Sequence, residues 1–336
     1  MSRSLDNDFL SRAYAAFDID SAATATSLGR ASANRTWRIQ TGRDSFFLKE
    51  FRYSPSDLRW VESLRAAVAF EIAIWRGGTI DMPAPVAGTS GELLETVAGS
   101  RGDDALVRLH RWTPGQSSHA QPAVSSIRAA GAQLGTVQAI GAEHSSARSG
   151  SLMWWNWDPR AALASFGEAG FLTAAEVARY ASIVDEAIDL AEVGQLTESW
   201  TFCHSDHKPD NVLLHDDRLI LTDWDEAALC PPRYEAAEAA LMWSGWDGRL
   251  ANRERMVAFL EGYRSTGAAF DRPEPLDFAK WAAERVGWFN YLALRTLGRM
   301  SGSDDEVAEA LTNAIATLRE TEAGLTQLER WAAWMS

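Results

Sequence analysis

One stretch of the sequence, residues 202–226, restricts the possible fold more than any other. Two short apolar runs, 212–214 and 219–221, lie on either side of the turn-forming residues 215–218. Apolar runs separated by a short polar turn are typical of a β-hairpin. Because the strands of a hairpin run antiparallel, the residues just before the first run and just after the second are expected at the same open end.

Polar residues gather at that expected open end. His204, Asp206 and Asn211 precede the first run, and Asp223 and Asp225 follow the second. Carboxylates brought together in a partly dry site repel each other, so such a group usually surrounds a cation. Mg²⁺ is commonly held by one or two carboxylates and an amide oxygen, while water or phosphate completes its coordination. The stretch therefore predicts a Mg²⁺ site.

The first third of the sequence has the pattern of an antiparallel sheet. Segments rich in β-forming side chains recur with turn signals between them. The strands are expected over 36–40, 45–51, 85–89, 92–97 and 105–112. A helix expected over 58–75 interrupts them and ends at Gly77 and Gly78.

A lysine, Lys49, stands within the most apolar of these strands. Lysine is rarely buried without a partner, so Lys49 either pairs with an acid or lies at an edge from which its ammonium reaches water. The helix over 58–75 offers two acids. At about 100° per residue, Glu71 falls at the border of the apolar face and Glu62 falls outside it. Glu71 is therefore the better candidate for a buried partner.

The remainder of the chain is mainly helical. Apolar residues recur at helical spacing over 124–137, 177–191 and 307–325. A Thr-Pro-Gly sequence marks a hinge before these helices. The expected fold is α+β with two lobes: a small antiparallel β-rich lobe over 1–108, a hinge over 109–116, and a larger, mainly helical lobe over 117–336. A pocket is expected in the cleft between such lobes.

Composition excludes several classes of function. The 336-residue chain is 46% hydrophobic and 23% charged, which argues against large disordered segments. A net charge of −14 argues against nucleic-acid binding, whereas it suits a cationic partner or solubility alone. Cys203 and Cys230 have no companion at metal-binding spacing and are expected to be reduced thiols. With no apolar leader and no run of membrane-spanning length, the protein is expected to be cytoplasmic and not membrane-bound.

The pattern His204-x-Asp206-x4-Asn211, followed by Asp223, resembles the catalytic and metal-binding loops of the kinase fold. More closely, residues 24–243 resemble the aminoglycoside phosphotransferase and choline kinase-like family of small-molecule kinases. The resemblance implies a protein kinase-like fold whose N-terminal lobe binds nucleotide. It also implies that the protein uses ATP, or GTP, together with Mg²⁺ as cofactors.

The same resemblance assigns roles to individual residues. Asp206 corresponds to the catalytic base that orients the substrate hydroxyl. Asn211 and Asp223 correspond to the residues that hold Mg²⁺. Lys49, paired with Glu71, corresponds to the lysine that positions the α- and β-phosphates.

Three neighbouring residues have more than one possible role. Lys208 either contacts the γ-phosphate or is a solvated loop lysine. His204 is expected to hold the loop by hydrogen bonds and not to accept the proton. Asp225 either adds a metal contact or bonds backbone amides, and it also counts among the possible substrate contacts.

The nucleotide loop departs from the glycine-rich pattern of protein kinases. Residues 28–35 lack G-x-G-x-x-G, although Ser32 and Asn34 resemble the small polar loop of the antibiotic kinases. These two residues are expected to contact nucleotide. Leu109, at the start of the hinge, is expected by its position to present backbone groups to adenine.

Two further departures separate the chain from regulated protein kinases. Ser205 replaces the arginine that precedes their catalytic aspartate and reads a phosphorylated activation segment. After Asp225 the sequence reaches an expected helix by Tyr234, which leaves no room for such a segment. A small-molecule substrate is therefore expected.

Aromatic clusters in the second lobe are the candidates for substrate binding. Aromatic faces and neighbouring carboxylates attract cations, although most tryptophans pack in cores. The possible substrate residues are Trp157, Asp158, Trp246 and Asp247.

The sequence thus indicates an ATP-dependent O-phosphotransferase that acts on a hydroxyl of an aminated small molecule. The first hypothesis for this acceptor is an aminoglycoside-type antibiotic, which implies antibiotic resistance. Choline, a sugar, and another antibiotic or metabolite stay open as acceptors. The alternative class is a catalytically inactive nucleotide-binding sensor or scaffold. The protein is expected to be a monomer or a homodimer.

Overall fold

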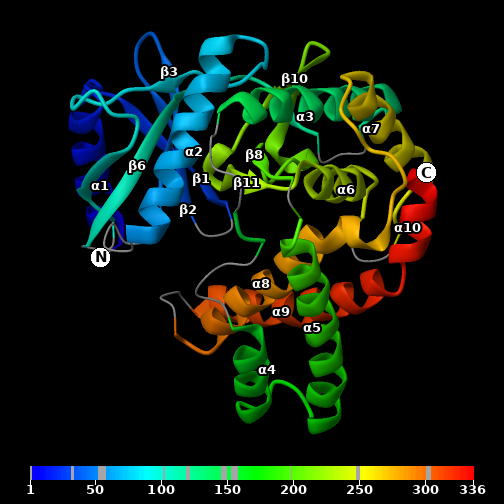
Figure 1. Cartoon of the computed structure of the whole chain (residues 1–336). Helices are drawn as coiled ribbons and strands as arrows, with labels where there is room; N and C mark the ends of the chain where they lie inside the picture. The colour runs from blue at the N-terminus through cyan, green and yellow to red at the C-terminus, as the bar shows by residue number, and fades with distance from the viewer. Residues whose placement is uncertain are drawn as a thin grey trace. The chain divides into compact units, whose positions relative to one another are not determined.

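The computed structural model describes residues 2–31, 34–51, 58–100, 103–118, 122–144, 150–152, 158–197, 199–246, 250–299 and 304–336. Two units make up the chain (Figure 1). Unit 1 comprises Met1–Ser118 and Asp210–Ala228, and unit 2 comprises His119–Pro209 and Leu229–Ser336. The hairpin of the sequence analysis therefore belongs to unit 1, although a long helical segment separates it from the rest of that unit along the chain.

The helices and strands have the following bounds. The α-helices are α1 (Ser2–Ala16), α2 (Leu58–Gly77), α3 (Val124–His144), α4 (Pro159–Glu168), α5 (Ala174–Gln195), α6 (Pro232–Trp243), α7 (Arg253–Ser265), α8 (Ala279–Thr296), α9 (Asp304–Leu325) and α10 (Leu328–Met335). The strands are β1 (Thr24–Ala31), β2 (Asn34–Gln40), β3 (Ser45–Glu50), β4 (Pro85–Val86), β5 (Glu95–Ala98), β6 (Asp104–Arg111), β7 (Gln116–Ser117), β8 (Thr201–Cys203), β9 (Val212–His215), β10 (Arg218–Leu221) and β11 (Ala228–Cys230). Short 3₁₀ turns are η1 (Pro209–Asn211), η2 (Trp224–Glu226) and η3 (Pro275–Phe278).

Unit 1 is built on an antiparallel sheet in the order β1-β2-β3-β6-β4, and β5 also pairs with β6. The predicted strands are therefore present. The strand near Pro85 is only two residues long, so the expected residues 87–89 lie beyond its end. An additional strand, β1, begins at Thr24, ahead of the first expected strand.

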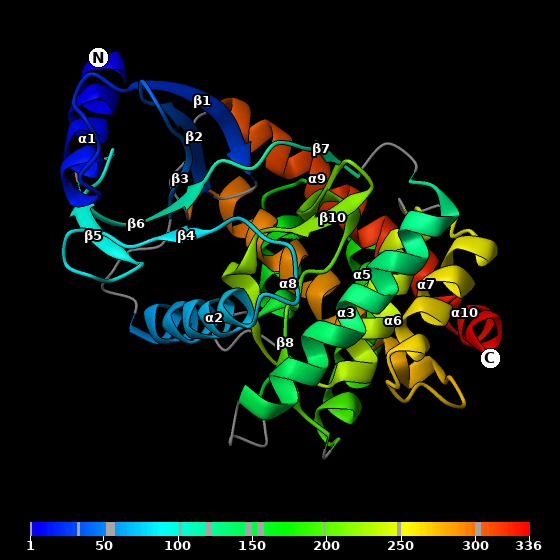
Figure 2. The ribbon, with the colours of Figure 1, turned by 90° about the horizontal axis from the view of Figure 1, so that it is seen from above.

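The two faces of this sheet differ in chemistry. Side chains alternate along β3 and β6, so Leu48 and Leu109 face α1 in one apolar core, whereas Leu106 packs with α2 on the other face. Figure 2 shows α1 and α2 beside the sheet. Lys49 and Arg108 alternate with the core leucines, so they also lie on the α2 face. The face toward α1 is thus mainly apolar, and the face toward α2 also carries the charges of Lys49 and Arg108.

The predicted hairpin is formed by β9 and β10. Its register pairs Val212 with Leu221 and His215 with Arg218, which leaves a two-residue turn. The turn residues Asp216 and Asp217 both have positive φ, at 47° and 63°, as a type I′ turn requires. The short strand β7 pairs with β9 on the other side.

Unit 2 is helical, with a short β8–β11 pair. The pair α3 and α7 lies side by side, as do α8 and α9, α5 and α8, and α6 and α7. A capping box of Thr173 and Glu176 starts α5. None of the described helices combines the length and the apolarity that crossing a lipid bilayer requires.

Two glycines allow α3 and α7 to approach closely. A Cβ on Gly131 would lie 1.9 Å from the Phe259 carbonyl oxygen, and a Cβ on Gly262 would lie 1.8 Å from the Arg128 carbonyl oxygen. Both distances are shorter than any real carbon–oxygen contact, and the opposing atoms are backbone. The helices must therefore separate to accept any other residue at either position.

We expect Gly262→Ala to lower the free energy of unfolding by about 2 kcal/mol, because overpacking a backbone contact outweighs the gain in helix propensity. Gly77→Ala is the matched control, since nothing lies within 4 Å of a Cβ there and its φ is not positive. Urea unfolding of both variants measures the difference. Equal stability of the two would contradict the close approach of α3 and α7.

Candidate active site

Lys49 lies on the charged face of the unit 1 sheet. It is only 6% exposed, and its partner across the β3–β6 ladder is Arg108, which is 1% exposed. Like charges directly opposite each other on antiparallel strands are destabilising. Two buried cations in this register therefore require carboxylates close by.

The segment that follows the hairpin supplies two of these carboxylates. The Lys49 Nζ lies 2.6 Å from Asp223 Oδ1 and also contacts Asp225 Oδ2. The other oxygen of Asp225, Oδ1, accepts a hydrogen bond of 3.0 Å from Arg108 Nη1. Asp225 thus bridges the two cations. The contacts that the structure gives Asp225 are these ion pairs with side chains, which the sequence did not predict, and the metal or substrate contact considered from the sequence stays a prediction.

Glu71, the third carboxylate, is buried on α2 as expected, but its partner differs from the expected one. It pairs with Arg108 and accepts a 2.8 Å hydrogen bond from His110 Nε2. The predicted Lys49–Glu71 pair is therefore wrong for this structure. The physical reason is that Arg108 competes for Glu71, since its long forked guanidinium reaches α2 and the bridging Asp225 at once, while Lys49 is satisfied by Asp223 and Asp225.

Electrostatics keep the two cations charged. Burial lowers the pKa of Lys49, but the carboxylates of Asp223 and Asp225 outweigh it, so the pKa is raised above its usual value. Burial lowers the pKa of Arg108, and Asp225 opposes that effect. Burial and the Arg108 charge lower the pKa of His110 to about 3, so His110 is neutral.

The charges of this cluster leave one carboxylate in excess. Glu71, Asp223 and Asp225 give −3, and Lys49 and Arg108 give +2, so the sum is −1. Asp223 has the most exposed of the three side chains, at 33%. The excess negative charge is therefore most accessible to solvent at Asp223. A site for a cation requires such access.

Asn211 lies just before the hairpin and is bonded to Thr222, the residue that precedes Asp223. The Asn211 carbonyl oxygen accepts hydrogen bonds from the Thr222 N–H, at 2.8 Å, and from the Thr222 hydroxyl, at 2.9 Å. Asp223 follows with φ of 62°, a left-handed conformation that is uncommon outside glycine and often found at functional sites. The amide and carboxylate oxygens of this pair are donors that suit Mg²⁺. Among the described residues, no three His, Cys, Asp or Glu side chains gather as a metal-binding group, so the remaining ligands would be water or phosphate.

The expected nucleotide contacts are only partly described. Ser32 lies outside the described residues, and Asn34 begins β2, where it pairs with Ala31. The Leu109 side chain is buried in the α1 core. Within the expected hinge, residues 109–116, the Trp112 N–H donates a hydrogen bond to the Ser45 carbonyl oxygen at 2.9 Å.

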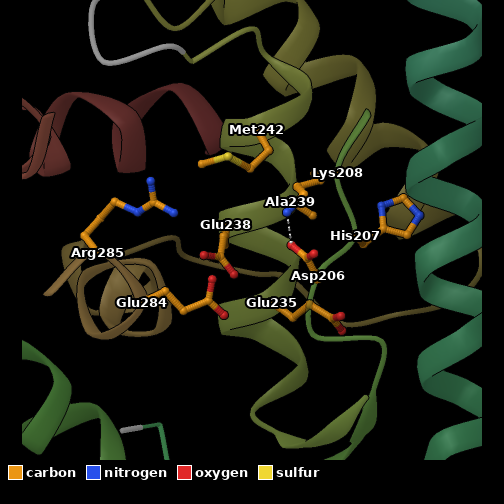
Figure 3. A pocket seen from close by; sticks show the side chains of 9 residues that line it. All are labelled: Asp206, His207, Lys208, Glu235, Glu238, Ala239, Met242, Glu284 and Arg285. Carbon is orange, nitrogen blue, oxygen red and sulfur yellow. Dashed lines mark ion pairs between the residues drawn. The ribbon is translucent and has the colours of Figure 1, made fainter. Parts of the chain in front are cut away.

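Asp206 follows β8 in unit 2 and lines a polar pocket (Figure 3). Its side chain is 26% exposed, and its Oδ1 lies 2.8 Å from Lys208 Nζ. Five acidic or basic side chains besides Asp206 line this pocket. The full lining is Asp206, His207, Lys208, Glu235, Glu238, Ala239, Met242, Glu284 and Arg285. The pocket therefore contains a carboxylate that is partly exposed to solvent.

Two buried histidines, His204 and His207, lie close to Asp206 in the sequence and make hydrogen bonds around it. His204 is fully buried, and its Nδ1 lies 3.4 Å from the Asp206 N–H, which agrees with the structural role expected for it. The Trp243 indole N–H donates to His207 Nδ1 at 3.1 Å. Burial, with a smaller effect of His204, lowers the pKa of His207 to about 3, so His207 is a neutral acceptor.

The aromatic clusters have structural contacts where they are described. Asp158 accepts from the Ala161 N–H and caps α4. Trp246 is buried, and its ring centroid lies 4.7 Å from that of Trp331. Trp157 and Asp247 lie outside the described residues. Core packing, the alternative weighed for the tryptophans, is therefore what the described contacts favour.

The phosphotransferase enzyme family model matches residues 24–273, about three quarters of the chain. The chain belongs to this family. The match spans Lys49, Asp206, Asn211 and Asp223, so one family pattern contains both the unit 1 cluster and the unit 2 pocket residue. No match to the sequence was found among curated proteins.

Solved structures of small-molecule kinases have the same fold as this phosphotransferase. Amicoumacin kinase hAmiN, in complex with AMP-PNP, Ca²⁺ and Ami, has a TM-score of 0.65 at 16% identity, over 93% of this chain and 94% of that one. Spectinomycin phosphotransferase APH(9)-Ia, in complex with ADP and spectinomycin, has a TM-score of 0.59 at 16% identity, over 88% and 93%. A microcompartment-associated aminopropanol kinase has a TM-score of 0.60 at 15% identity, over 97% and 98%. The predicted α+β, protein kinase-like fold is confirmed.

Sequence reasoning missed several charged residues of this phosphotransferase. The signal that singled out Lys49, a charge inside an apolar segment, is equally present at Arg108 in an apolar strand. It is present again in the alanine-rich α6, where Glu235 and Glu238 are spaced by three residues, and at Lys280 in α8. Each of these side chains is buried. A search for every charge in an apolar context would have found them.

We expect Asp225→Asn to lower the free energy of unfolding by about 3 kcal/mol, because it removes one partner from a buried ion-pair cluster. Asp44→Asn is the matched control: Asp44 also pairs with an arginine of β6, Arg111, but the Asp44 side chain is 47% exposed. An exposed pair contributes about 0.5 kcal/mol. Chemical unfolding measures both, and a loss of less than 1 kcal/mol at Asp225 would contradict the bridging role.

The low pKa of His207 predicts a loss of stability in acid. The unfolded chain has a histidine pKa of about 6.5, whereas the folded pKa is about 3, so the unfolded state binds more protons between these values. The free energy of unfolding should therefore fall as the pH is lowered from 6.5, by up to about 1.4 kcal/mol per pH unit.

His207→Asn keeps an acceptor for Trp243 and removes the titrating ring. Unfolding curves at pH 7, 6 and 5 should show a shallower pH dependence in this variant than in the parent. An unchanged slope would contradict the assignment of His207 as a buried neutral imidazole.

Proposed function

We propose that this phosphotransferase moves the γ-phosphate of ATP to a hydroxyl group of an aminated small molecule. The observation that carries the proposal is Asp206, a partly exposed carboxylate that lines a polar pocket and lies within the residues that the family model matches. A carboxylate in such a position is suited to accept a hydrogen bond from an acceptor hydroxyl.

The roles of the residues follow from the chemistry of phosphoryl transfer. That reaction needs an oriented hydroxyl and neutralisation of the charge on the transferred oxygens. Asp206 orients the hydroxyl and receives its proton, and Lys208, which pairs with Asp206, contacts the γ-phosphate. Lys49 contacts the α- and β-phosphates. Mg²⁺, held by Asn211 and Asp223, supplies charge neutralisation when bound.

The charge of the unit 1 cluster supports this assignment. Lys49 is shared between Asp223 and Asp225, so it keeps one carboxylate partner if Asp223 turns to a cation. Arg108 likewise keeps Glu71 and Asp225. Asp225 and Glu71 therefore act as supports for the two cations, and Asp223 is the carboxylate available for the metal.

The acceptor is proposed to carry an amine. Among the structural relatives, two are named for the antibiotics amicoumacin and spectinomycin, and one is named for aminopropanol, an amino alcohol. The net charge of −14 also suits a cationic acceptor. An aminoglycoside-type antibiotic is the first candidate, which would make the protein a resistance enzyme, and choline or a sugar is the second. The oligomeric state and the cytoplasmic location stay predictions from the sequence.

The different-class alternative is a nucleotide-binding sensor or scaffold without turnover. A panel of kanamycin, spectinomycin, 1-amino-2-propanol and choline, screened for ADP release with ATP and Mg²⁺, separates the two classes. ADP release that depends on one of these acceptors supports the enzyme. ATP binding without release for any acceptor would favour the sensor.

We expect Asp206→Asn to lower kcat by about 10²–10⁴-fold, because the amide cannot accept the hydroxyl proton. ATP affinity, measured by calorimetry, should stay within about twofold, since Asp206 is not assigned to the nucleotide. The control is Asp216→Asn, at the 87% exposed tip of the hairpin, where asparagine tolerates the positive φ. Turnover by Asp206→Asn equal to that of the control would rule out Asp206 as the base.

A further inference from the structure

Ser205, the residue before Asp206, has an unusual backbone conformation. Its φ is 66°, in the left-handed region that residues with a side chain adopt at a cost in free energy. Such a conformation persists only where the surrounding structure holds it, and it is most common at functional sites. The groups that hold Ser205 therefore also fix the peptide that carries Asp206.

The N–H of Ser205 is held by a chain of buried side chains. It donates to Glu235 Oε1 at 2.5 Å. The other oxygen of Glu235 accepts from Gln138 Nε2 at 2.7 Å, and Gln138 Oε1 accepts from the Tyr263 hydroxyl at 2.6 Å. Helices α6, α3 and α7 thus contribute to one hydrogen-bond network that ends at Ser205.

The carbonyl oxygen of Ser205 is held by a buried ammonium. Lys280 Nζ, from α8, donates to it at 2.7 Å. The same ammonium pairs with Glu238 of α6 and Glu284 of α8. An ammonium has three N–H donors, and Lys280 has three acceptors, so each donor direction is used. Lys280 is only 5% exposed, which excludes competing water from most of this contact.

The carboxylates around Lys280 balance its charge. Burial and the neighbouring Glu284 raise the pKa of Glu238 well above its usual range. Although burial opposes it, the Lys280 charge lowers the pKa of Glu284, which stays ionised. The Lys280 ammonium and the ionised Glu284 therefore compensate each other's charge.

We propose that Lys280 is a positioning residue for phosphotransfer, whose ammonium fixes the Ser205 carbonyl and thereby the orientation of the Asp206 carboxylate. The proposal rests on the proposed function, in which Asp206 is the base. Small displacements of a catalytic group, of about 1 Å, can lower a rate by about 10²-fold. Lys280 bonds the backbone of the loop and pairs with two carboxylates, and it is not among the residues that line the pocket, so its replacement should affect kcat and leave ATP binding unchanged.

A merely structural role must be separated from this one. Lys280 also neutralises buried carboxylates, and its loss alone would leave Glu284 without a cation. The double variant Lys280→Met with Glu284→Gln removes one charge of each sign, so it leaves the net charge of the cluster unchanged but lacks the donor to Ser205. Glu284→Gln alone is the matched control, because it differs from the double variant only at position 280.

Two measurements on these variants decide the proposal. Hydrogen–deuterium exchange reports the protection of residues 203–209 without any acceptor. Steady-state ADP release reports kcat with the acceptor of the panel that the parent phosphorylates fastest. We expect exchange in 203–209 at least tenfold faster in the double variant than in Glu284→Gln, and kcat at least 30-fold lower, with ATP KM within about twofold.

Other outcomes count against the proposal. Equal exchange of 203–209 in the two proteins, or a kcat of the double variant within threefold of the control, would overturn it. If the double variant does not fold, Lys280→Leu with Glu284→Leu is compared with Glu284→Leu by the same criteria, because apolar replacement of a buried ion pair is often tolerated. If the parent phosphorylates no acceptor, the proposed function fails, whereas the exchange comparison still tests whether Lys280 holds the loop.

Discussion

The placement of Lys49 directly opposite Arg108 is the constraint on which unit 1 depends. Two cations facing each other on a buried sheet surface cannot be stable without carboxylates between them. Glu71 comes from the helix on that face, and Asp223 and Asp225 come from a hairpin segment more than a hundred residues further along the chain. The need to neutralise these cations therefore helps to explain why the hairpin belongs to unit 1.

Apolar packing and a backbone hydrogen bond also hold the hairpin segment within unit 1. Trp224, between the two aspartates, is buried with its ring centroid 6.0 Å from that of Phe70 on α2. The Leu221 N–H donates to the Asp81 carbonyl oxygen at 2.8 Å. Packing and backbone bonds thus fix the position of the segment, and the ion pairs fix the orientation of its carboxylates. Because packing carries much of the burial, Asp223 can remain partly exposed for a cation.

Unit 2 also contains a buried ion-pair cluster, but the role proposed for it differs from that in unit 1. There a buried lysine, Lys280, also stands between two carboxylates, but its third donor bonds a backbone carbonyl. In unit 1 the ion pairs orient groups proposed to contact nucleotide and metal. In unit 2 they hold the backbone beside the proposed base. Buried ion pairs are weak evidence for stability, and a role in fixing a specific geometry is the more economical account of both clusters.

Short-range sequence patterns made several secondary-structure elements and buried charges predictable. The hairpin, the strands that contain Lys49 and Arg108, and the capping box at Thr173 follow from spacing that only short-range geometry has to satisfy. The burial of Lys49 and Glu71 was also predictable, because a charge within an apolar pattern must be accommodated.

The partners of these charges were not predictable, because they depend on which elements pack together. The sequence suggested Lys49 as the partner of Glu71, whereas in the structure Glu71 pairs with Arg108, whose strand packs against α2 through Leu106. The left-handed Ser205 and its contact with Lys280, 75 residues away, have no local sequence signal. Long-range charge pairing and backbone strain are therefore the parts of the site that needed the structure.

The central claim, that the protein transfers a phosphoryl group to an alcohol, is tested most directly by ³¹P nuclear magnetic resonance. ATP, Mg²⁺ and an amino-alcohol acceptor are incubated with the protein, and the fate of the γ-phosphate is followed. The account predicts that the γ-phosphate signal is replaced by that of a phosphomonoester on the acceptor, together with ADP. Inorganic phosphate as the sole product, or an unchanged ATP spectrum with every acceptor tested, would contradict it.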